Sequence, residues 1–316
     1  MNIGYDAKRV FHNTTGLGNY SRDTLRILAD QFIDHKYLLY NPRLGSINRL
    51  ELKSNMFVCM PKIKIWKKLN SLWRQKAIVK DLLEDNVQIY HGLSNELPIG
   101  IEKTNIKTVV TIHDLIFLRY PKLYSYLEVK IYLKKFNRAV HAADKIIAIS
   151  EQTKKDIVNF FKIKEEKVEV VYQGCHAAFK ESYSTEEKQK VKDKYFLPHK
   201  YLLNVGTIQE RKNLLTIVKA IKNTSDHLVV VGKKTKYLDK VKKYIITNGM
   251  EQRVHFPQVV NMTDLAMIYQ MANIFIYPSV FEGFGIPIIE ALFSKIPVVS
   301  SKGSCFKEAG GQIVFI

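Results

Sequence analysis

The sequence predicts an α/β protein made of two Rossmann-like domains, and three observations support this fold class. A length of 316 residues is enough for about two domains that each bury a core. Short apolar runs typical of buried strands alternate with helical patterns in both halves of the chain. Glycine-containing loops connect some of these strands to the helices that follow, which is typical of folds that bind ligands beyond the ends of parallel strands.

The N-terminal domain is predicted to span residues 1–180. Ser150 is suited to cap a helix that follows it, because its hydroxyl can accept a hydrogen bond from an unpaired backbone N–H group. A longer helix is expected over about 126–143. Strands are expected at 2–5, 37–40, 56–59, 87–90, 107–112, 145–150 and 168–172.

A polar stretch of mixed charge, 181–199, is predicted to be the interdomain linker. The C-terminal domain then spans 200–316 and repeats the alternation of strand, loop and helix. Its strands are expected at 201–206, 227–232, 254–260, 274–277, 297–300 and 312–316.

The most informative stretch is YPSVFEGFGIPIIEAL, residues 277–292. The strand before it ends in a tight glycine loop, and Pro287 is suited to the first position of a helix. Unpaired backbone N–H groups and the helix dipole at such a terminus attract a phosphate or a sugar hydroxyl. Glu290 could accept two hydrogen bonds from a vicinal diol, and Glu282 would lie on the loop. A solvated glutamate pair is the alternative, but the glycines and the proline favour a binding site.

This stretch resembles the Glu-x7-Glu segment of the retaining, nucleotide-sugar-dependent glycosyltransferases of the "group one" family. That family has the GT-B fold, in which two Rossmann-like domains face a central cleft. The resemblance extends from Asp6 to Gly311 and includes TGLGNY at 15–20, HDL at 113–115 and VGTIQERKN at 205–213. Family members continue for some tens of residues, so the resemblance implies that the C-terminal helices are missing and this domain is incomplete.

The resemblance implies a retaining, mannosyltransferase-like hexosyltransferase. It would move a hexose, with GDP-mannose as the favoured donor, to a hydroxyl of a lipid-linked or polysaccharide acceptor in the biosynthesis of a cell-surface glycan such as lipopolysaccharide. Two alternatives remain open, a nucleotide-sugar epimerase of the same fold and an inactive nucleotide-sugar-binding protein at a membrane surface.

Individual residues acquire expected roles from position and resemblance together. Arg211 and Lys212 are predicted at a helix N-terminus, where cations oppose the helix dipole, so an anion is expected to compensate them. His113 follows a buried strand and could hydrogen-bond the sugar, with Asp114 orienting it. The predicted catalytic residues are Glu282, His113, Arg211 and Lys212, and the predicted donor-binding residues are Gly16, Gly18, Gly206, Arg211, Lys212, Phe284, Gly285, Ile286 and Glu290.

No cofactor or obligatory metal is expected, because Arg211 and Lys212 would themselves neutralise the departing diphosphate and no Asp-x-Asp motif is present. Cys59, Cys175 and Cys305 are far apart and predict neither a disulfide framework nor a zinc site. The N-terminus lacks a signal-peptide pattern and no apolar run approaches the ~20 residues of a spanning helix, so a cytoplasmic location is expected.

The formal charge of +19 predicts an anionic partner. The basic and aromatic residues follow no known nucleic-acid-binding motif, so no nucleic-acid partner is expected. Segment 61–80 is rich in lysine and has no acidic residue. Its apolar residues share one face of a helical wheel, which indicates a helix that contacts an anionic membrane reversibly or, equally, a core helix whose tryptophans pack on the sheet. The apolar residues are Ile65, Trp66, Leu69, Leu72 and Trp73.

Overall fold

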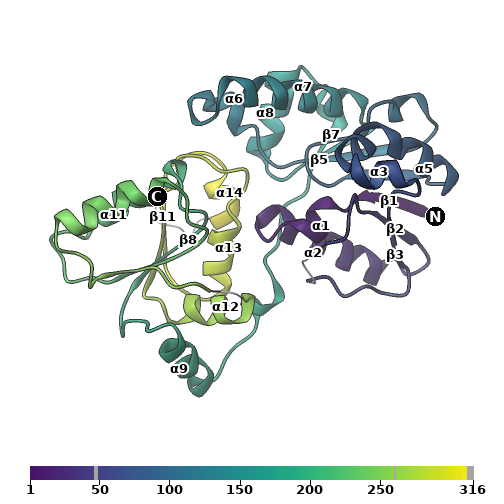
Figure 1. The fold of residues 1–316 in the computed structure, drawn as a ribbon. Coiled ribbons are helices and arrows are strands. Elements are labelled where there is room, and N and C mark those ends of the chain that lie inside the picture. Colours follow the sequence, from purple (N-terminus) through teal and green to yellow (C-terminus); the bar gives the residue numbers. More distant parts are fainter. Residues whose placement is uncertain (46–48, 260, 312–316) are drawn as a thin grey trace. The chain divides into compact units, whose positions relative to one another are not determined.

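A computed structural model of the chain describes residues 1–45, 49–259 and 261–311 (Figure 1). The chain divides into two compact units, Met1–Gln173 and Gly174–Ile316, here called unit 1 and unit 2. Each unit is a parallel sheet with helices on both of its faces, which confirms the predicted Rossmann-like architecture. The strand predicted over 312–316 lies outside the described residues, as does residue 260 of the strand predicted over 254–260.

In the described part of unit 1 the strand order is β3-β2-β1-β4-β5-β6-β7, and every pairing is parallel. The strands are β1 (Asn2–Asp6), β2 (Lys36–Tyr40), β3 (Met56–Cys59), β4 (Ile89–Gly92), β5 (Lys107–Ile112), β6 (Lys145–Ala148) and β7 (Val168–Val170). The helical segments are α1 (Lys8–His12), α2 (Gly16–Gln31), α3 (Lys64–Lys68), α4 (Asn70–Leu72), η1 (Trp73–Ala77), α5 (Ile78–Glu84), η2 (Ile101–Lys103), α6 (Ile116–Arg119), η3 (Pro121–Leu123), α7 (Tyr126–Ala142), α8 (Glu151–Phe161) and η4 (Glu165–Lys167).

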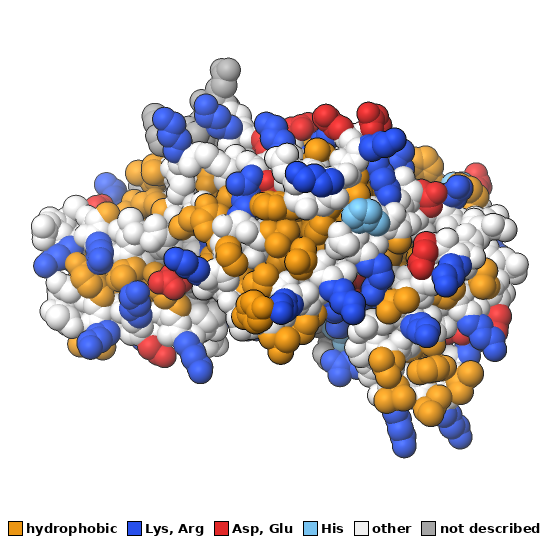
Figure 2. Space-filling view, turned by 90° about the horizontal axis from the view of Figure 1, so that it is seen from above, with side chains coloured by type: hydrophobic (Ala, Val, Ile, Leu, Met, Phe, Trp, Pro, Cys, Tyr) orange, Lys and Arg blue, Asp and Glu red, His pale blue; other side chains and the backbone are white. Residues whose placement is uncertain are grey.

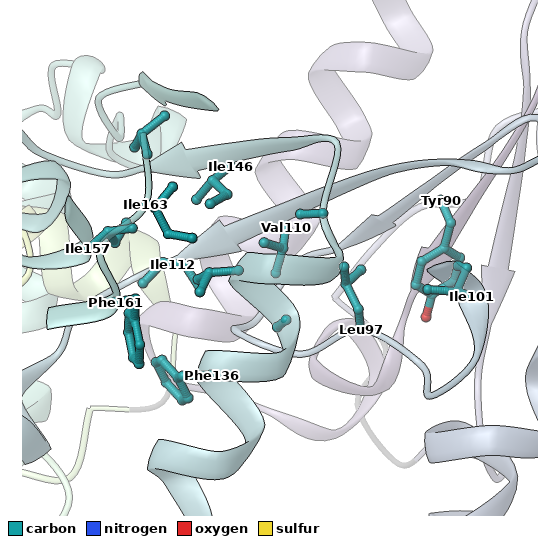
Figure 3. Close-up of a cluster of buried hydrophobic side chains, with 14 of the residues drawn as sticks. Tyr90, Leu97, Ile101, Val110, Ile112, Phe136, Ile146, Ile157, Phe161 and Ile163 are labelled. Atoms are coloured by element: carbon teal, nitrogen blue, oxygen red, sulfur yellow. The ribbon is translucent and has the colours of Figure 1, made fainter. Parts of the chain in front are cut away.

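Unit 1 has a hydrophobic cluster on each face of its sheet, because the side chains of each strand alternate between the faces. Tyr5 of β1 packs with α1 and α2 on one face. On the other face, Phe136 of α7 and Phe161 of α8 meet Ile112 of β5 and Ile146 of β6 (Figure 3). The helices are thereby fixed against the sheet, and the loops at the carboxyl ends of the strands are held in place.

In the described part of unit 2 the strand order is β10-β9-β8-β11-β12, again with parallel pairings. The strands are β8 (Leu202–Val205), β9 (Leu228–Val231), β10 (Val254–His255), β11 (Ile274–Tyr277) and β12 (Val298–Ser300). The helical segments are η5 (Ala177–Lys180), α9 (Thr185–Lys194), η6 (Glu210–Lys212), α10 (Leu214–Ala220), α11 (Tyr237–Thr247), α12 (Met262–Met271), α13 (Ile286–Phe293) and α14 (Phe306–Gly310).

The segment predicted as a linker, 181–199, is instead part of unit 2, whose boundary with unit 1 follows Gln173. It contains α9, which starts with a capping box between Ser184 and Glu187. Lys194 and Tyr195 then bond to the carboxylate of Asp264 on α12, at 2.7 and 2.6 Å. The polar composition of this stretch reflects an exposed helix that is anchored to its unit by an ion pair.

Segment 61–80 is not one continuous amphipathic helix. It runs through α3, α4, the π-helical turn η1 and the start of α5. Trp73 is fully buried and Trp66 packs on the same core, as the core-helix interpretation predicted for the tryptophans. Ile65, Leu69 and Leu72 remain exposed, so the apolar residues of this segment are not all used in packing against the core.

Among the residues that the structure describes, no helix is both long enough and apolar enough to cross a bilayer.

Candidate active site

The loop between β11 and α13 forms the centre of the site in unit 2. Gly285 is the N-cap residue of α13 and has a φ of +105°, a conformation that side-chain-bearing residues rarely adopt. Ile286 is the first residue of the helix and Pro287 the second, one position later than predicted. Phe284 is buried beside the turn. The predicted tight turn into a helix is therefore confirmed.

Arg211 and Lys212 both contact the carboxylate of Glu282 on this loop. Arg211 Nη1 lies 2.6 Å and Lys212 Nζ 2.7 Å from Glu282 Oε1. The same oxygen accepts a hydrogen bond from Ser279. Arg211 also donates to the carbonyl of Phe281, which fixes the guanidinium against the loop. The structure thus brings together three of the predicted catalytic residues, in a setting where each side chain is less than 15% exposed.

The cations do not lie at the N-terminus of an α-helix, contrary to the prediction. They occupy the short 3-10 turn η6, and Asn213, in the left-handed conformation, separates this turn from α10. The compensating anion in this structure is Glu282 of the chain itself. The lysine ammonium also donates to the hydroxyl of Tyr277 and lies 4.7 Å from the centre of its ring.

Electrostatics in this cluster favour the charged form of the glutamate. Burial alone would raise the pKa of Glu282, but Lys212 and Arg211 outweigh it and lower this pKa to about 2. Burial lowers the pKa of Lys212, and Glu282 opposes that effect. Two cations and one carboxylate leave a net positive charge beside the glycine turn, and this charge favours binding of an anionic ligand.

Gly206 follows β8 and lies beside the lysine. Its φ is +145°, and a Cβ atom added there would be 3.5 Å from Lys212 Cε. Gly232, the residue after β9, makes a closer approach, since a Cβ atom added there would be 1.8 Å from the carbonyl oxygen of Gly206. This loop therefore passes close to β9, and the lysine side chain extends beside it.

Glu290 lies inside α13 and is only 6% exposed. Its Oε2 accepts a hydrogen bond of 3.0 Å from the hydroxyl of Tyr269 on α12. Burial raises the pKa of Glu290 to about 7, against smaller opposing effects of Tyr269 and Lys212. The carboxyl group predicted to bind a diol is therefore already hydrogen-bonded to a tyrosine, and it changes charge near neutral pH.

Residues outside the predicted set bond to the backbone of the loop between β11 and α13. Ser304 bonds to the backbone of Glu282, and Cys305 Sγ lies 2.8 Å from the carbonyl oxygen of Phe284. Ser279 and Tyr277 are part of the quoted motif, so their positions within it could have identified them. Nothing in the sequence pattern singles out Ser304, Cys305 or Tyr269.

In unit 1 the predicted glycine loop begins α2, after the short helix α1. Asn13 Oδ1 accepts hydrogen bonds from the backbone N–H groups of Thr15 and Gly18. A Cβ on Gly18 would be 2.0 Å from the carbonyl oxygen of Asn13, whereas one on Gly16 would meet nothing within 4 Å. Gly18 is thus required for close backbone packing, and Gly16 is the glycine of this loop whose Cα faces open space.

His113 follows β5, as predicted, and is 5% exposed. Its Nε2 lies 2.8 Å from the carbonyl oxygen of Leu93, which can only accept, so this nitrogen carries the proton. Nδ1 then accepts from Gln173 Nε2 at 3.3 Å. Burial is the main cause that lowers the pKa of His113 to about 4. The imidazole is neutral, and its N–H group is used within unit 1. Asp114 accepts a hydrogen bond from Ile116 N at the start of α6.

Comparisons with known proteins identify the family to which this chain belongs. Residues 15–179 match the family described as Glycosyltransferase Family 4, and residues 185–311 match Glycosyl transferases group 1. The chain is 29% identical over 202 residues to the O-antigen chain mannosyltransferase RfbU of Salmonella typhimurium, covering 63% of this chain and 53% of that protein. It is 26% identical over 231 residues to the O-antigen chain mannosyltransferase B of Escherichia coli, covering 71% and 59%. The chain thus spans little more than half the length of these relatives.

Solved structures share the fold at lower sequence identity. Anabaena Alr3699/HepE in complex with UDP and glucose superposes with a TM-score of 0.71 at 17% identity, covering 98% of this chain and 82% of that one. The lipopolysaccharide-biosynthesis glycosyltransferase WaaG gives 0.71 at 14% identity, covering 98% and 83%. These similarities confirm the predicted GT-B fold class. The chain belongs to the glycosyltransferase families 4 and group 1, whose sequence patterns together cover most of its length.

Proposed function

We propose that this protein transfers a hexose from a nucleotide diphosphate sugar to an acceptor hydroxyl, with retention at the anomeric carbon. The observation that carries the proposal is the convergence of Arg211 and Lys212 on Glu282 in front of α13. Buried, preorganised cations stabilise the charge that grows on a diphosphate as its bond to the sugar breaks. The names of the O-antigen mannosyltransferases support mannose as the hexose, and we propose GDP-mannose as the donor.

The proposed binding mode begins with an exchange of anions. Diphosphate oxygens would replace Glu282 Oε1 as the partners of Arg211 and Lys212, with charge-assisted bonds of about 1.5–3 kcal/mol each. The freed carboxylate of Glu282, with the backbone of Phe284 and Gly285, would then hydrogen-bond the hexose hydroxyls.

The remaining predicted residues complete the donor site in this proposal. Glu290 would exchange the tyrosine hydroxyl for the ribose diol, and Gly206 and Ile286 would allow close approach of the phosphates. In unit 1, the residues proposed to bind the hexose and the acceptor are His113 and the loop that contains Gly16 and Gly18. Because the protein's own cations neutralise the diphosphate, we propose that no metal is obligatory.

The proposed acceptor is a lipid-linked or polysaccharide chain of a cell-surface glycan such as lipopolysaccharide, in keeping with the named relatives. A lipid-linked acceptor would be met at a membrane. Segment 61–80 exposes Ile65, Leu69 and Leu72 beside lysines, which supports reversible contact with an anionic bilayer.

The test is a product assay with the purified chain, labelled GDP-mannose, UDP-glucose or ADP-glucose, and an alkyl mannoside as acceptor. We expect mannose transfer that depends on the acceptor, resists EDTA and gives a product with the anomeric configuration of the donor by NMR. An inverted product would contradict retention. Interconversion of the sugar without acceptor would identify an epimerase, and donor binding without any turnover would identify an inactive binder.

A further inference from the structure

His113 is held in unit 1 by contacts that leave one ring nitrogen for a further group. Its backbone N–H donates to Asn95 Oδ1 at 2.8 Å, and its Nε2–H donates to the carbonyl oxygen of Leu93 at 2.8 Å. The ring of Tyr20, on α2, packs edge-on against the imidazole, with 4.8 Å between the ring centres. Because Nε2 carries the proton and is already bonded, Nδ1 is the nitrogen that could bind a ligand, and it can only accept a hydrogen bond.

The side chain of Gln173 occupies this acceptor in the structure. Its Nε2 lies 3.3 Å from His113 Nδ1 and donates to it. This bond is longer than the 2.8 Å bond to Leu93, so it is the weaker of the two that hold the ring. Both partners are neutral. Exchange of the amide for another neutral donor, such as the hydroxyl of a sugar, would leave the number of hydrogen bonds to the imidazole unchanged.

Gln173 is also the last residue of unit 1. It lies in the segment 171–176, which has no helix or strand and leads from β7 to η5 of unit 2. The backbone of this segment is bonded to unit 1 where Val171 N donates to the carbonyl oxygen of Ala148 at 2.9 Å. Gly174, the first residue of unit 2, is exposed. The imidazole of His113 is therefore bonded to the residue at which the chain leaves unit 1.

We propose that Gln173 is a positioning residue that occupies the Nδ1 lone pair of His113 until a hydroxyl of the hexose replaces it. Since His113 binds the hexose in the proposed function, on which this inference rests, the hexose must present a hydroxyl at this nitrogen. A carboxylate or a methyl group offers no hydrogen to the lone pair and would be rejected. Hexose binding would also release the Gln173 side chain, so the connecting segment would lose one of its bonds to unit 1.

The test compares the calorimetric binding of GDP-mannose and of GDP to the full chain, as wild type and as Gln173→Met. Methionine is unbranched and about as long as glutamine but donates no hydrogen bond, so Nδ1 is left unpaired in the ligand-free variant. We expect the variant to bind GDP-mannose about fivefold more tightly than the wild type does, because the hydroxyl displaces no amide. The dissociation constant of GDP should be unchanged.

The comparison with GDP removes the effect of overall charge. Lysine and arginine side chains are spread over the face of the molecule in Figure 2, and the formal charge of the chain is +19. Both nucleotides are therefore attracted electrostatically. The ratio of their dissociation constants cancels this attraction and isolates the contribution of the hexose.

Nuclear magnetic resonance measures the contact itself. In an isotope-labelled chain, the side-chain amide signal of Gln173 is identified by its absence from the spectrum of Gln173→Met, which also shows that the variant is folded. We expect GDP-mannose to shift this signal in the wild type and GDP to leave it in place, because only the sugar would displace the amide from the imidazole.

Gln152 supplies a matched control. It is another half-buried glutamine of unit 1, and its Nε2 donates to Asp156 Oδ1 on α8 at 2.9 Å. Gln152→Met should bind both nucleotides as the wild type does. An affinity for GDP-mannose that is unchanged or lower in Gln173→Met would overturn the proposal and leave Gln173 a purely structural role. So would an amide signal that GDP-mannose does not shift, or equal gains in the two glutamine variants.

Transfer assays separate this contact from the proposed function. Transfer of mannose by the wild type, with the same ratio of the two dissociation constants in Gln173→Met, would refute the exchange and keep the transferase. Tighter binding of GDP-mannose by the variant, without turnover in either chain, would refute the transferase and keep the exchange. A wild type that binds none of the GDP, UDP and ADP sugars would refute both.

Discussion

Replacement of Glu282 by glutamine tests the proposed anion exchange most directly. The change keeps the shape of the side chain but leaves Arg211 and Lys212 without a carboxylate. The pKa of Glu282 is lowered to about 2, which corresponds to about 3 kcal/mol of favourable interaction for the ionised form. We therefore expect Glu282→Gln to lower the free energy of unfolding of unit 2 by about 3 kcal/mol, or about 10 °C in Tm.

The difference in stability between the variant and the wild type depends on ligand and on pH. GDP should stabilise the variant more than the wild type, because the diphosphate meets cations that no carboxylate neutralises and displaces no carboxylate. Since a lowered pKa stabilises the fold only above the ordinary value, the wild type should lose this contribution as the pH falls from about 4.5 towards 2, and the variant should not.

The assay is differential scanning calorimetry with and without GDP, with Glu210→Gln as the matched control. Glu210 lies in the same turn as the cations, but it pairs with Lys240 at an exposed site and should contribute little. A glutamine variant as stable as the wild type, or one that gains no more from GDP, would refute the role given to Glu282 as the resident anion.

Three further predictions concern single residues. Arg211→Ala should lower kcat/KM for hexose transfer about 10- to 100-fold through loss of a charge-assisted bond, and unchanged kinetics with a water-soluble acceptor would remove its diphosphate role. The raised pKa of Glu290 should make wild-type unit 2 lose about 3 kcal/mol between about pH 4.5 and 7, as urea unfolding would show, and a Glu290→Gln variant that kept this slope would contradict the assignment. Gly18→Ala should lower the free energy of unfolding of unit 1 by about 2 kcal/mol because its Cβ would overlap the Asn13 carbonyl, whereas Gly16→Ala, which meets open space, should be tolerated.

Much of the fold could be predicted from sequence patterns. The strands at 56–59, 107–112 and 274–277 have the predicted bounds, and Ser150 caps α8 by accepting from Thr153 N. Apolar runs between glycine or polar breaks determine strands locally, so these predictions need no knowledge of the partners. The linker prediction was wrong because a polar stretch does not distinguish an exposed helix from a linker, although the capping box at Ser184 was a usable signal.

The sequence could predict which residues form the candidate site, but not which of them bond to each other. The motif placed Glu282, Arg211 and Lys212 in one ligand site, yet nothing local shows that the carboxylate and the cations bond to each other, because the two ion pairs join residues that are far apart in the chain. The hydrogen bond from Tyr269 to Glu290 likewise joins two separate helices and could not be predicted from local sequence. In segment 61–80 the helical wheel could not show that the tryptophans are buried while the aliphatic residues are exposed, because both kinds of residue are apolar. Only the packing of the segment against the sheet decides which of them are buried.

In the proposed function, the contact between Glu282 and its two cations makes the donor site selective among anions. Chloride and inorganic phosphate would be attracted by an arginine–lysine pair that no carboxylate neutralises. A carboxylate that is covalently part of the same loop competes at a high effective concentration, so a weakly held or singly charged ion gains little by displacing it. A diphosphate can engage both cations at once, and the sugar attached to it then gives the displaced carboxylate new hydroxyl partners. The proposed donor site would thereby discriminate against anions that bring no sugar.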